Sequence, residues 1–263
     1  MSETPASPQL QGQMFLFEKP ELISKEQHGE LGLTQPDKRY GFCANCRAIP
    51  LTVSEIPAAM KDYPVVFASQ EQMVPLAITG LIDDVNLFVS EDGDWEHQRY
   101  IPGYIRRYPF GVATQTDSDR FAIVVDTGFA GLMKGGENPL FDNGEPSELT
   151  QQTIEFCKSY EEDRLRTIEF GERIKELGVS KGQSAQFTPM GESEPRTFAE
   201  YLGVDENAIK ELPAEKLAEL RDSGLLPLMY AMIMSMGNWR MLLQRRANRF
   251  NLTDKDILTQ VVN

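Results

Sequence analysis

Hydrophobic and polar positions change over short distances in the first half of the chain. Between residues 13 and 146, short apolar or β-branched segments are separated by turn residues, and they predict strands at Met14–Phe17, Tyr40–Ile49, Pro64–Ala68, Val74–Leu81, Asn86–Val89, Gly111–Gln115 and Phe121–Asp126. The close spacing leaves no room for crossover helices, so the sheet should be mainly antiparallel. Two short helices are predicted among the strands: Ser54–Asp62, which Ser54 can cap, and Pro102–Arg107.

The pattern becomes helical after Pro146. A long helix is predicted over Thr150–Leu177 because apolar residues recur along one face and Gly178 follows as a C-terminal cap. The apolar residues that we expect on its buried face are Ile154, Cys157, Leu165, Ile168, Ile174 and Leu177. A β-hairpin follows over about residues 183–202. Further helical segments are expected at Glu206–Leu212, Ala214–Asp222, Leu225–Phe250 and Asp254–Val262.

These patterns together predict an α+β fold, with a mainly antiparallel N-terminal part and a helical C-terminal part. Residues 1–12 are rich in Ser, Thr, Pro and Gln and predict a disordered tail. Residues 13–146 form the β-rich domain. Residues 147–263 form the mainly helical region, which we expect to pack on the sheet as one compact unit.

Charge narrows the classes of partner. The 263 residues include 26 Lys and Arg against 40 Asp and Glu, which gives a formal net charge of −14. Such an acidic protein repels phosphates, so neither nucleic acid nor an anionic membrane surface is an expected partner. The longest nearly apolar run, Leu225–Met236, is shorter than the roughly 20 residues that span a bilayer. The first residues show no signal-peptide pattern, so we expect a cytoplasmic protein without a membrane span.

One cysteine pair resembles a functional motif. Cys43 and Cys46 are separated by two residues and fall inside the expected strand Tyr40–Ile49. They are interpreted as inert core residues, with a redox couple and a metal site as alternatives. A structural zinc site needs four ligands, and Cys157 and the two histidines lie far away in sequence. We therefore predict neither a metal nor a cofactor.

The segment from Trp95 to Phe110 is the strongest candidate for ligand binding. It combines aromatic residues with arginines, a combination suited to carboxylates, sugars or peptides. The candidate ligand-binding residues are Trp95, Tyr100, Tyr104, Arg106 and Arg107. On a short helix, Arg107 would stack on Tyr104 and keep its guanidinium free, while Arg106 would hold an internal carboxylate. The alternative is an aromatic core whose arginines pair with some of the many acidic residues.

Methionines are concentrated in the last long helix. Met229, Met232, Met234, Met236 and Met241 lie among leucines over residues 225–243. Flexible thioethers can line adaptable grooves, but the helical spacing favours a core or a homo-oligomer interface.

Several blocks of the sequence resemble the SapC family. The most specific is Tyr100–Phe110, which reads YIPGYIRRYPF. Other matching blocks lie at Ile49–Leu51, Tyr63–Phe67, Pro75–Leu81, Asn86–Val89, Pro139–Phe141, Gly144–Pro146, Val204–Glu206, Leu212–Pro213 and Tyr230–Asn238. The family name implies a link to bacterial surface-layer proteins. The resemblance assigns a catalytic role to none of the residues in this sequence.

Two functions follow from these observations. The first is a non-catalytic binding or accessory protein in cell-envelope or surface-layer biogenesis or in nutrient uptake, with a protein or a small polar ligand as partner. The second is an enzyme that acts on a small polar or carbohydrate-like ligand at the Trp95–Phe110 segment, with a carboxylate such as Asp126. A buried carboxylate of raised pKa beside the segment would favour the enzyme, and a flat aromatic–arginine patch would favour the binding protein.

Overall fold

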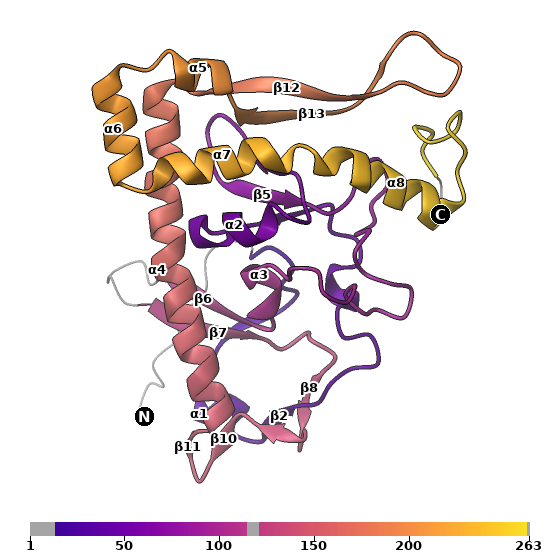
Figure 1. Ribbon diagram of the computed structural model, residues 1–263. Coiled ribbons are helices and arrows are strands. Elements are labelled where there is room, and N and C mark those ends of the chain that lie inside the picture. Colours follow the sequence, from indigo (N-terminus) through magenta and orange to yellow (C-terminus); the bar gives the residue numbers. More distant parts are fainter. Residues whose placement is uncertain (1–13, 115–120, 262–263) are drawn as a thin grey trace. The chain divides into compact units, whose positions relative to one another are not determined.

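The computed structural model describes residues 14–114 and 121–261 (Figure 1). The predicted α+β class is confirmed: the N-terminal part forms antiparallel sheets, and helices dominate the C-terminal part. The contacts divide the chain into two compact units, each built from two stretches of sequence. The first is Met1–Phe42 with Arg107–Glu161, and the second is Cys43–Arg106 with Glu162–Asn263. The tail expected over residues 1–12 lies outside the described residues.

The first unit contains small antiparallel sheets around one apolar cluster. One sheet has the order β1-β7-β6, a second has the order β8-β2-β9, and β10 pairs with β11. Phe110, Val125, Leu140 and Cys157 form the buried cluster. The elements are β1 (Pro20–Leu22), α1 (Lys25–His28), β2 (Leu31–Leu33), β6 (Phe110–Thr114), β7 (Phe121–Asp126), β8 (Leu132–Lys134), β9 (Asn138–Pro139), β10 (Phe141–Asp142), β11 (Glu145–Pro146) and the start of α4 (Glu148–Leu177).

The second unit is organised on a five-stranded antiparallel sheet of order β12-β13-β4-β5-β3. The hairpin of β12 and β13 runs from Ser180 to Val204. The strands are β3 (Ala48–Pro50), β4 (Val65–Phe67), β5 (Pro75–Ile78), β12 (Ser180–Phe187) and β13 (Arg196–Val204). The helices besides the end of α4 are η2 (Val53–Glu55), α2 (Ile56–Ala59), α3 (Gly103–Arg106), α5 (Glu206–Lys210), α6 (Ala214–Asp222), α7 (Leu225–Ser235) and α8 (Asn238–Phe250).

Helix α4 ends where the sequence predicts. Gly178 follows its last residue and has a φ of +64°, the left-handed conformation that glycine adopts readily as a C-terminal cap. Its buried face differs from the prediction at two positions. Leu165 and Ile168 are 43% and 39% exposed, while Phe170 and Ile174 are buried. The two halves of α4 belong to different compact units, so the buried face lies on a different side of the helix in each half. A single helical spacing of apolar residues over the whole helix does not describe such a change.

Two predicted strands are replaced by turns. Met14–Phe17 forms a turn because Leu16 adopts a φ of +69°, which interrupts extended backbone. Tyr40–Ile49 divides into the 3₁₀ helix η1 (Gly41–Cys43), a turn closed by the Cys46 N–H on the Cys43 carbonyl, and the start of β3. The strand prediction for this segment is therefore wrong.

Three further segments depart from the prediction. Asn86–Val89 makes only an isolated bridge between Val89 and Trp95. The long helix Leu225–Phe250 is interrupted between α7 and α8 at Met236–Gly237. Described residues from Asp254 onward form turns, since Thr253 and Asp256 hydrogen-bond each other locally and compete with a helix.

Candidate functional site

The aromatic segment predicted from sequence surrounds a buried carboxylate. Glu55, at the end of η2, is 6% exposed. Its Oε2 accepts the Thr52 N–H and hydroxyl at 2.8 and 3.0 Å, and its Oε1 accepts the Tyr100 hydroxyl and the Gly103 N–H at 2.9 and 2.5 Å. Thr52, rather than the predicted Ser54, therefore caps this helix. Four donors occupy the carboxylate, so Glu55 holds the segment in place.

A second set of ion pairs holds the same segment. Asp62 accepts the Arg99 guanidinium at 3.0 Å and the Tyr100 N–H at 2.9 Å. Glu96 pairs with both Arg99 and Arg245. The hydrogen bond from Arg245 is the main reason that the pKa of Glu96 is lowered, against a burial effect that raises it. Among the described residues, every carboxylate with a shifted pKa has it lowered.

The five candidate residues lie in different surroundings. Trp95 and Tyr104 are buried. Arg106 is exposed, lies 5.8 Å from the centre of the Tyr100 ring, and donates to the Tyr100 hydroxyl and the Ile101 carbonyl. Burial and the neighbouring Glu55 raise the pKa of Tyr100. The structure thus brings Arg106 and Tyr100 together.

Arg107 belongs to the other compact unit. Its guanidinium lies 4.8 Å from the centre of the Tyr160 ring and is buried, with 6% of the residue exposed. The prediction that Arg107 stacks on Tyr104 and keeps its guanidinium free for a ligand is therefore wrong, because the guanidinium is buried against Tyr160 instead. Its contact with Tyr160 is typical of a packed cation–π pair.

Asp126, the carboxylate suggested for an enzyme, is fully buried and saturated. It accepts the backbone N–H groups of Glu18, Lys19 and Gly128 at 2.7–3.0 Å and the Tyr108 hydroxyl at 2.9 Å. Burial, the hydrogen bond to Asp126 and the negative charges of Asp126 and Glu18 raise the pKa of Tyr108. The Asp126 carboxylate therefore joins the loops around β7.

The cysteines are free, buried thiols. Burial and the adjacent Cys46 raise the pKa of Cys43 well above its usual range, and burial raises the pKa of Cys46 and of Cys157 to about 11. A thiol with such a pKa is protonated at neutral pH and is a poor nucleophile. No group of three or more metal-ligating side chains occurs within residues 14–114 and 121–261.

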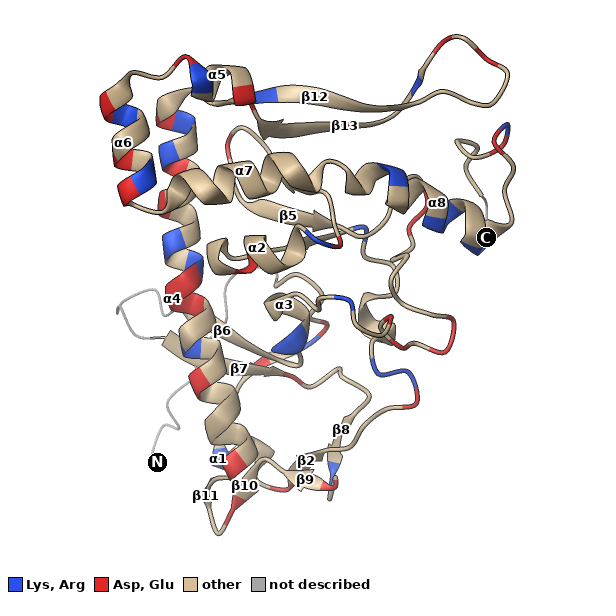
Figure 2. Cartoon of the chain, in the orientation of Figure 1, with Lys and Arg blue, Asp and Glu red and all other residues tan. Residues whose placement is uncertain are grey.

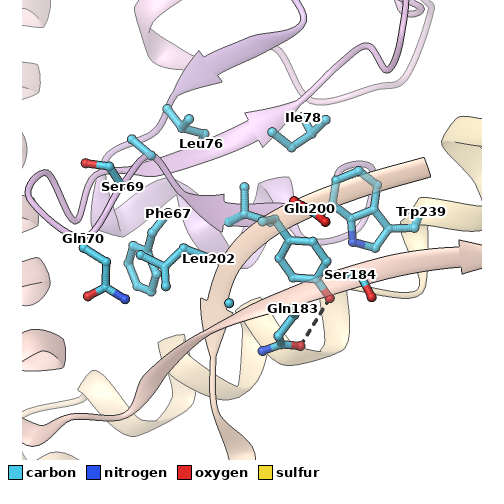
Figure 3. Close-up of a pocket in the computed structure, with 14 residues that line it drawn as sticks. Phe67, Ser69, Gln70, Leu76, Ile78, Gln183, Ser184, Glu200, Leu202 and Trp239 are labelled. Carbon is cyan, nitrogen blue, oxygen red and sulfur yellow. Dashed lines mark hydrogen bonds between the residues drawn. The ribbon is translucent and has the colours of Figure 1, made fainter. Parts of the chain in front are cut away.

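A groove of about 820 Å³ opens beside the hairpin in the second unit (Figure 3). Strands β13 and β4 pair only at Leu202 and Phe67, so the two strands diverge beyond this point. Leu76 and Ile78 lie on one face of β5 because they are two residues apart, and both are only partly buried since the divergence uncovers that face. We call this cavity the hairpin groove.

The hairpin groove combines two aromatic rings with uncharged polar groups. Trp239 and Tyr201 have ring centres 5.2 Å apart at 38°. The Tyr201 hydroxyl donates to Gln183 at 3.2 Å, and the Gln183 amide donates to the Val204 carbonyl at 3.0 Å. These bonds fix the amide while leaving one of its N–H groups available to a ligand. Ser69, Gln70 and Ser184 supply the remaining uncharged polar side chains of the lining.

The charge of the groove is low and negative. Glu200 is the one residue with a full charge among the described residues of the lining, which include no Lys or Arg. Figure 2 shows that the hairpin strands carry few charged residues. An anionic ligand would find no cation here, whereas a neutral polar ligand would meet donors and acceptors.

Comparison with protein families shows to which family the chain belongs. The SapC family model matches residues 23–242, most of the sequence. The chain belongs to the SapC family. No curated protein and no solved structure matches it.

The matched range of this SapC-family protein contains all the described lining residues of the hairpin groove and also the Tyr100–Phe110 block. The block could be selected from the sequence because its aromatic and basic residues lie close together along the chain. The groove could not be selected in this way because the lining residues come from three distant stretches, 66–78, 182–202 and 239. One available signal was the pair of uncharged polar residues Gln183 and Ser184 at the start of the predicted hairpin.

The Met-rich segment is divided between two helices and two environments. Met229 and Met232 are buried in α7, whereas Met234 and Met241 are 66% and 40% exposed. A homo-oligomer interface at this segment remains a prediction. No described helix is long and apolar enough to cross a membrane.

Proposed function

We propose that this SapC-family protein is a non-catalytic binding protein that serves cell-envelope or surface-layer biogenesis or nutrient uptake, and that its hairpin groove binds a small, hydroxyl-rich, carbohydrate-like ligand. The main support is the lining of the groove. Two aromatic rings stand beside amide and hydroxyl groups, and the described lining contains no cation.

This chemistry suits a saccharide better than an anion. A sugar ring has apolar C–H faces that pack on Trp239 or Tyr201. Its hydroxyls are both donors and acceptors, and amide and hydroxyl side chains satisfy both. The Glu200 carboxylate can accept hydrogen bonds from hydroxyl groups but repels phosphates and carboxylates, so the groove selects against anionic ligands.

The arrangement of carboxylates supports binding over catalysis. General acid–base chemistry at a sugar uses a pair of carboxyl groups. The described lining offers Glu200 alone, and Glu200 is exposed. Glu55 and Asp126, near the predicted segment, are each occupied by four hydrogen-bond donors.

The proposal is tested by isothermal titration calorimetry with maltotetraose, cellotetraose and tetra-N-acetylchitotetraose. We expect saturable binding of at least one of them. Gln183→Ala should weaken that binding about threefold to tenfold, since one net hydrogen bond contributes about 0.5–1.5 kcal/mol. Gln186→Ala removes the same amide from the same strand outside the groove lining, so it should leave the affinity unchanged.

Two results would contradict the proposal. One is the absence of binding by all three saccharides, and the other is an equal loss in Gln186→Ala and Gln183→Ala. The non-catalytic assignment is tested separately by prolonged incubation with the saccharide that binds, followed by chromatography. Release of shorter saccharides by the purified protein, abolished in Glu200→Gln, would favour the enzyme.

A further inference from the structure

A second cavity of about 780 Å³ lies in the same unit, between the outer part of the hairpin, α8 and the C-terminal segment. It shares Ser184, Tyr201 and Trp239 with the hairpin groove but has a different lining otherwise. We call it the α8 cavity. Its apolar wall consists of Ala185, Phe187, Phe198, Met236, Trp239, Leu243 and Ile257.

The apolar wall is formed by aromatic and aliphatic side chains that pack on one another. The Phe198 ring meets Trp239 edge-on, with ring centres 6.1 Å apart at 77°. Leu243 and Ile257 belong to one buried cluster that also packs Phe187 and Phe198. The rings are therefore held by packing, and an apolar group that enters the cavity meets an ordered surface.

Two opposite charges line the α8 cavity without pairing with each other. Arg240 makes no hydrogen bond or ion pair within the described part of the chain. Asp254 accepts one hydrogen bond, from the Met190 N–H at 3.3 Å, and has no ion-pair partner among the described residues. Most other arginines of α8 differ: Arg245 pairs with Glu96, and Arg246 pairs with Asp83.

An apolar wall with separate positive and negative groups fits a zwitterion. We propose that the α8 cavity binds a free α-amino acid with an apolar side chain, whose carboxylate meets Arg240 and whose ammonium group meets Asp254. The guanidinium can bind a carboxylate through two N–H groups, and the Asp254 carboxylate is an acceptor for an ammonium group. A simple anion would be attracted by Arg240 but repelled by Asp254, and a simple cation the reverse, whereas a zwitterion can gain attraction at both groups. The apolar side chain would pack on Phe198, Leu243 and Ile257.

The test is isothermal titration calorimetry with four probes: L-phenylalanine, L-leucine, N-acetyl-L-phenylalanine and L-phenylalaninamide. At least one of the two free amino acids should bind. N-acetyl-L-phenylalanine lacks the ammonium group and L-phenylalaninamide lacks the carboxylate, so each should bind at least tenfold more weakly than L-phenylalanine.

Variants assign the two ends of the ligand. Arg240→Gln should weaken binding of the free amino acid at least tenfold but leave the affinity for the amide unchanged. Asp254→Asn should weaken the free amino acid similarly but leave the affinity for the N-acetyl compound unchanged. Both side chains are exposed, so circular dichroism and thermal melting should show unaltered folding. Arg249→Gln removes the same charge from α8 outside the cavity and should have no effect.

The proposal is overturned if neither free amino acid binds at millimolar concentration. It is also overturned if N-acetyl-L-phenylalanine binds as tightly as L-phenylalanine, because the ligand would then be an amphipathic anion. Equal losses in Arg249→Gln and Arg240→Gln would indicate an unspecific charge effect and reject the site. Neither Arg240 nor Asp254 lines the hairpin groove, so saccharide binding should persist in both variants and the two proposals fail separately.

Discussion

At the scale of single residues, burial decides the chemistry of the cysteine pair. Cys43 has no exposed surface and Cys46 is 8% exposed. Burial raises the pKa of both thiols, and the pKa of Cys46 reaches about 11. A raised pKa keeps the proton on sulfur at neutral pH, so the motif lacks the thiolate that redox chemistry requires.

We therefore expect replacement of Cys43 and Cys46 together by Ala to leave ligand affinity unchanged. The stability loss should be about 1–2 kcal/mol, the order expected when small buried side chains are shortened. Urea unfolding measures the loss, and calorimetry with the saccharide measures affinity. A loss of binding at unchanged stability would return the pair to a functional role.

At the scale of elements, a buried ion pair fixes the C-terminal segment. Asp83 holds the Arg246 guanidinium of α8 through two hydrogen bonds of 2.6 and 3.1 Å. Asp83 also accepts the Val261 N–H at 2.9 Å, while Arg246 donates to the Ile257 and Thr259 carbonyls. Burial alone would raise the pKa of Asp83, but the hydrogen bonds from Arg246 and Val261 outweigh burial and lower it.

Asp83→Ala should destabilise the protein by about 3–5 kcal/mol at pH 7, because it leaves the buried Arg246 charge unpaired. A carboxyl group with a lowered folded-state pKa contributes stability above its unfolded pKa of about 3.9, and this contribution is lost as the pH falls through the folded value. The difference between wild type and Asp83→Ala in urea unfolding should therefore shrink below about pH 4. A constant difference from pH 7 to pH 3 would show that the ionised pair contributes nothing.

The local sequence was enough to predict those helices and strands whose ends are marked by turn or capping residues nearby. The helix Ala214–Asp222 and the strand Phe121–Asp126 have the predicted bounds, and Gly178 ends α4. The strands predicted at Met14–Phe17 and Tyr40–Ile49 are absent, because the conformation of these segments is set by a backbone angle and by a contact with a distant stretch. Leu16 adopts a left-handed φ, and the Asn86 side chain donates to the Cys43 carbonyl from a distant stretch. The spacing of hydrophobic residues along the chain predicts neither the backbone angle of one residue nor a hydrogen bond from a distant stretch.

At the scale of the whole molecule, the candidate site depends on how strands diverge. Sequence spacing predicted that Arg107 stacks on Tyr104, but Arg107 lies over the Tyr160 ring, and it is Arg106 that lies over a ring of the segment, that of Tyr100. The hairpin groove instead exists because β13 pairs with β4 only at Leu202, and residues of three stretches line the opening. A sequence pattern reports the periodicity of each strand, but the pairing between distant strands is set by packing of the complete unit.

The central claim is that ligand binds at the hairpin groove rather than at the Trp95–Phe110 segment. The chain has two tryptophans, Trp95 in the segment and Trp239 in the groove, so a ¹⁵N-labelled sample gives one indole N–H signal for each. The most direct measurement is to follow both signals by two-dimensional NMR during titration with the saccharide that binds. The account predicts a saturable shift of the Trp239 signal while the Trp95 signal stays in place. A shift of Trp95 with Trp239 unmoved would contradict it.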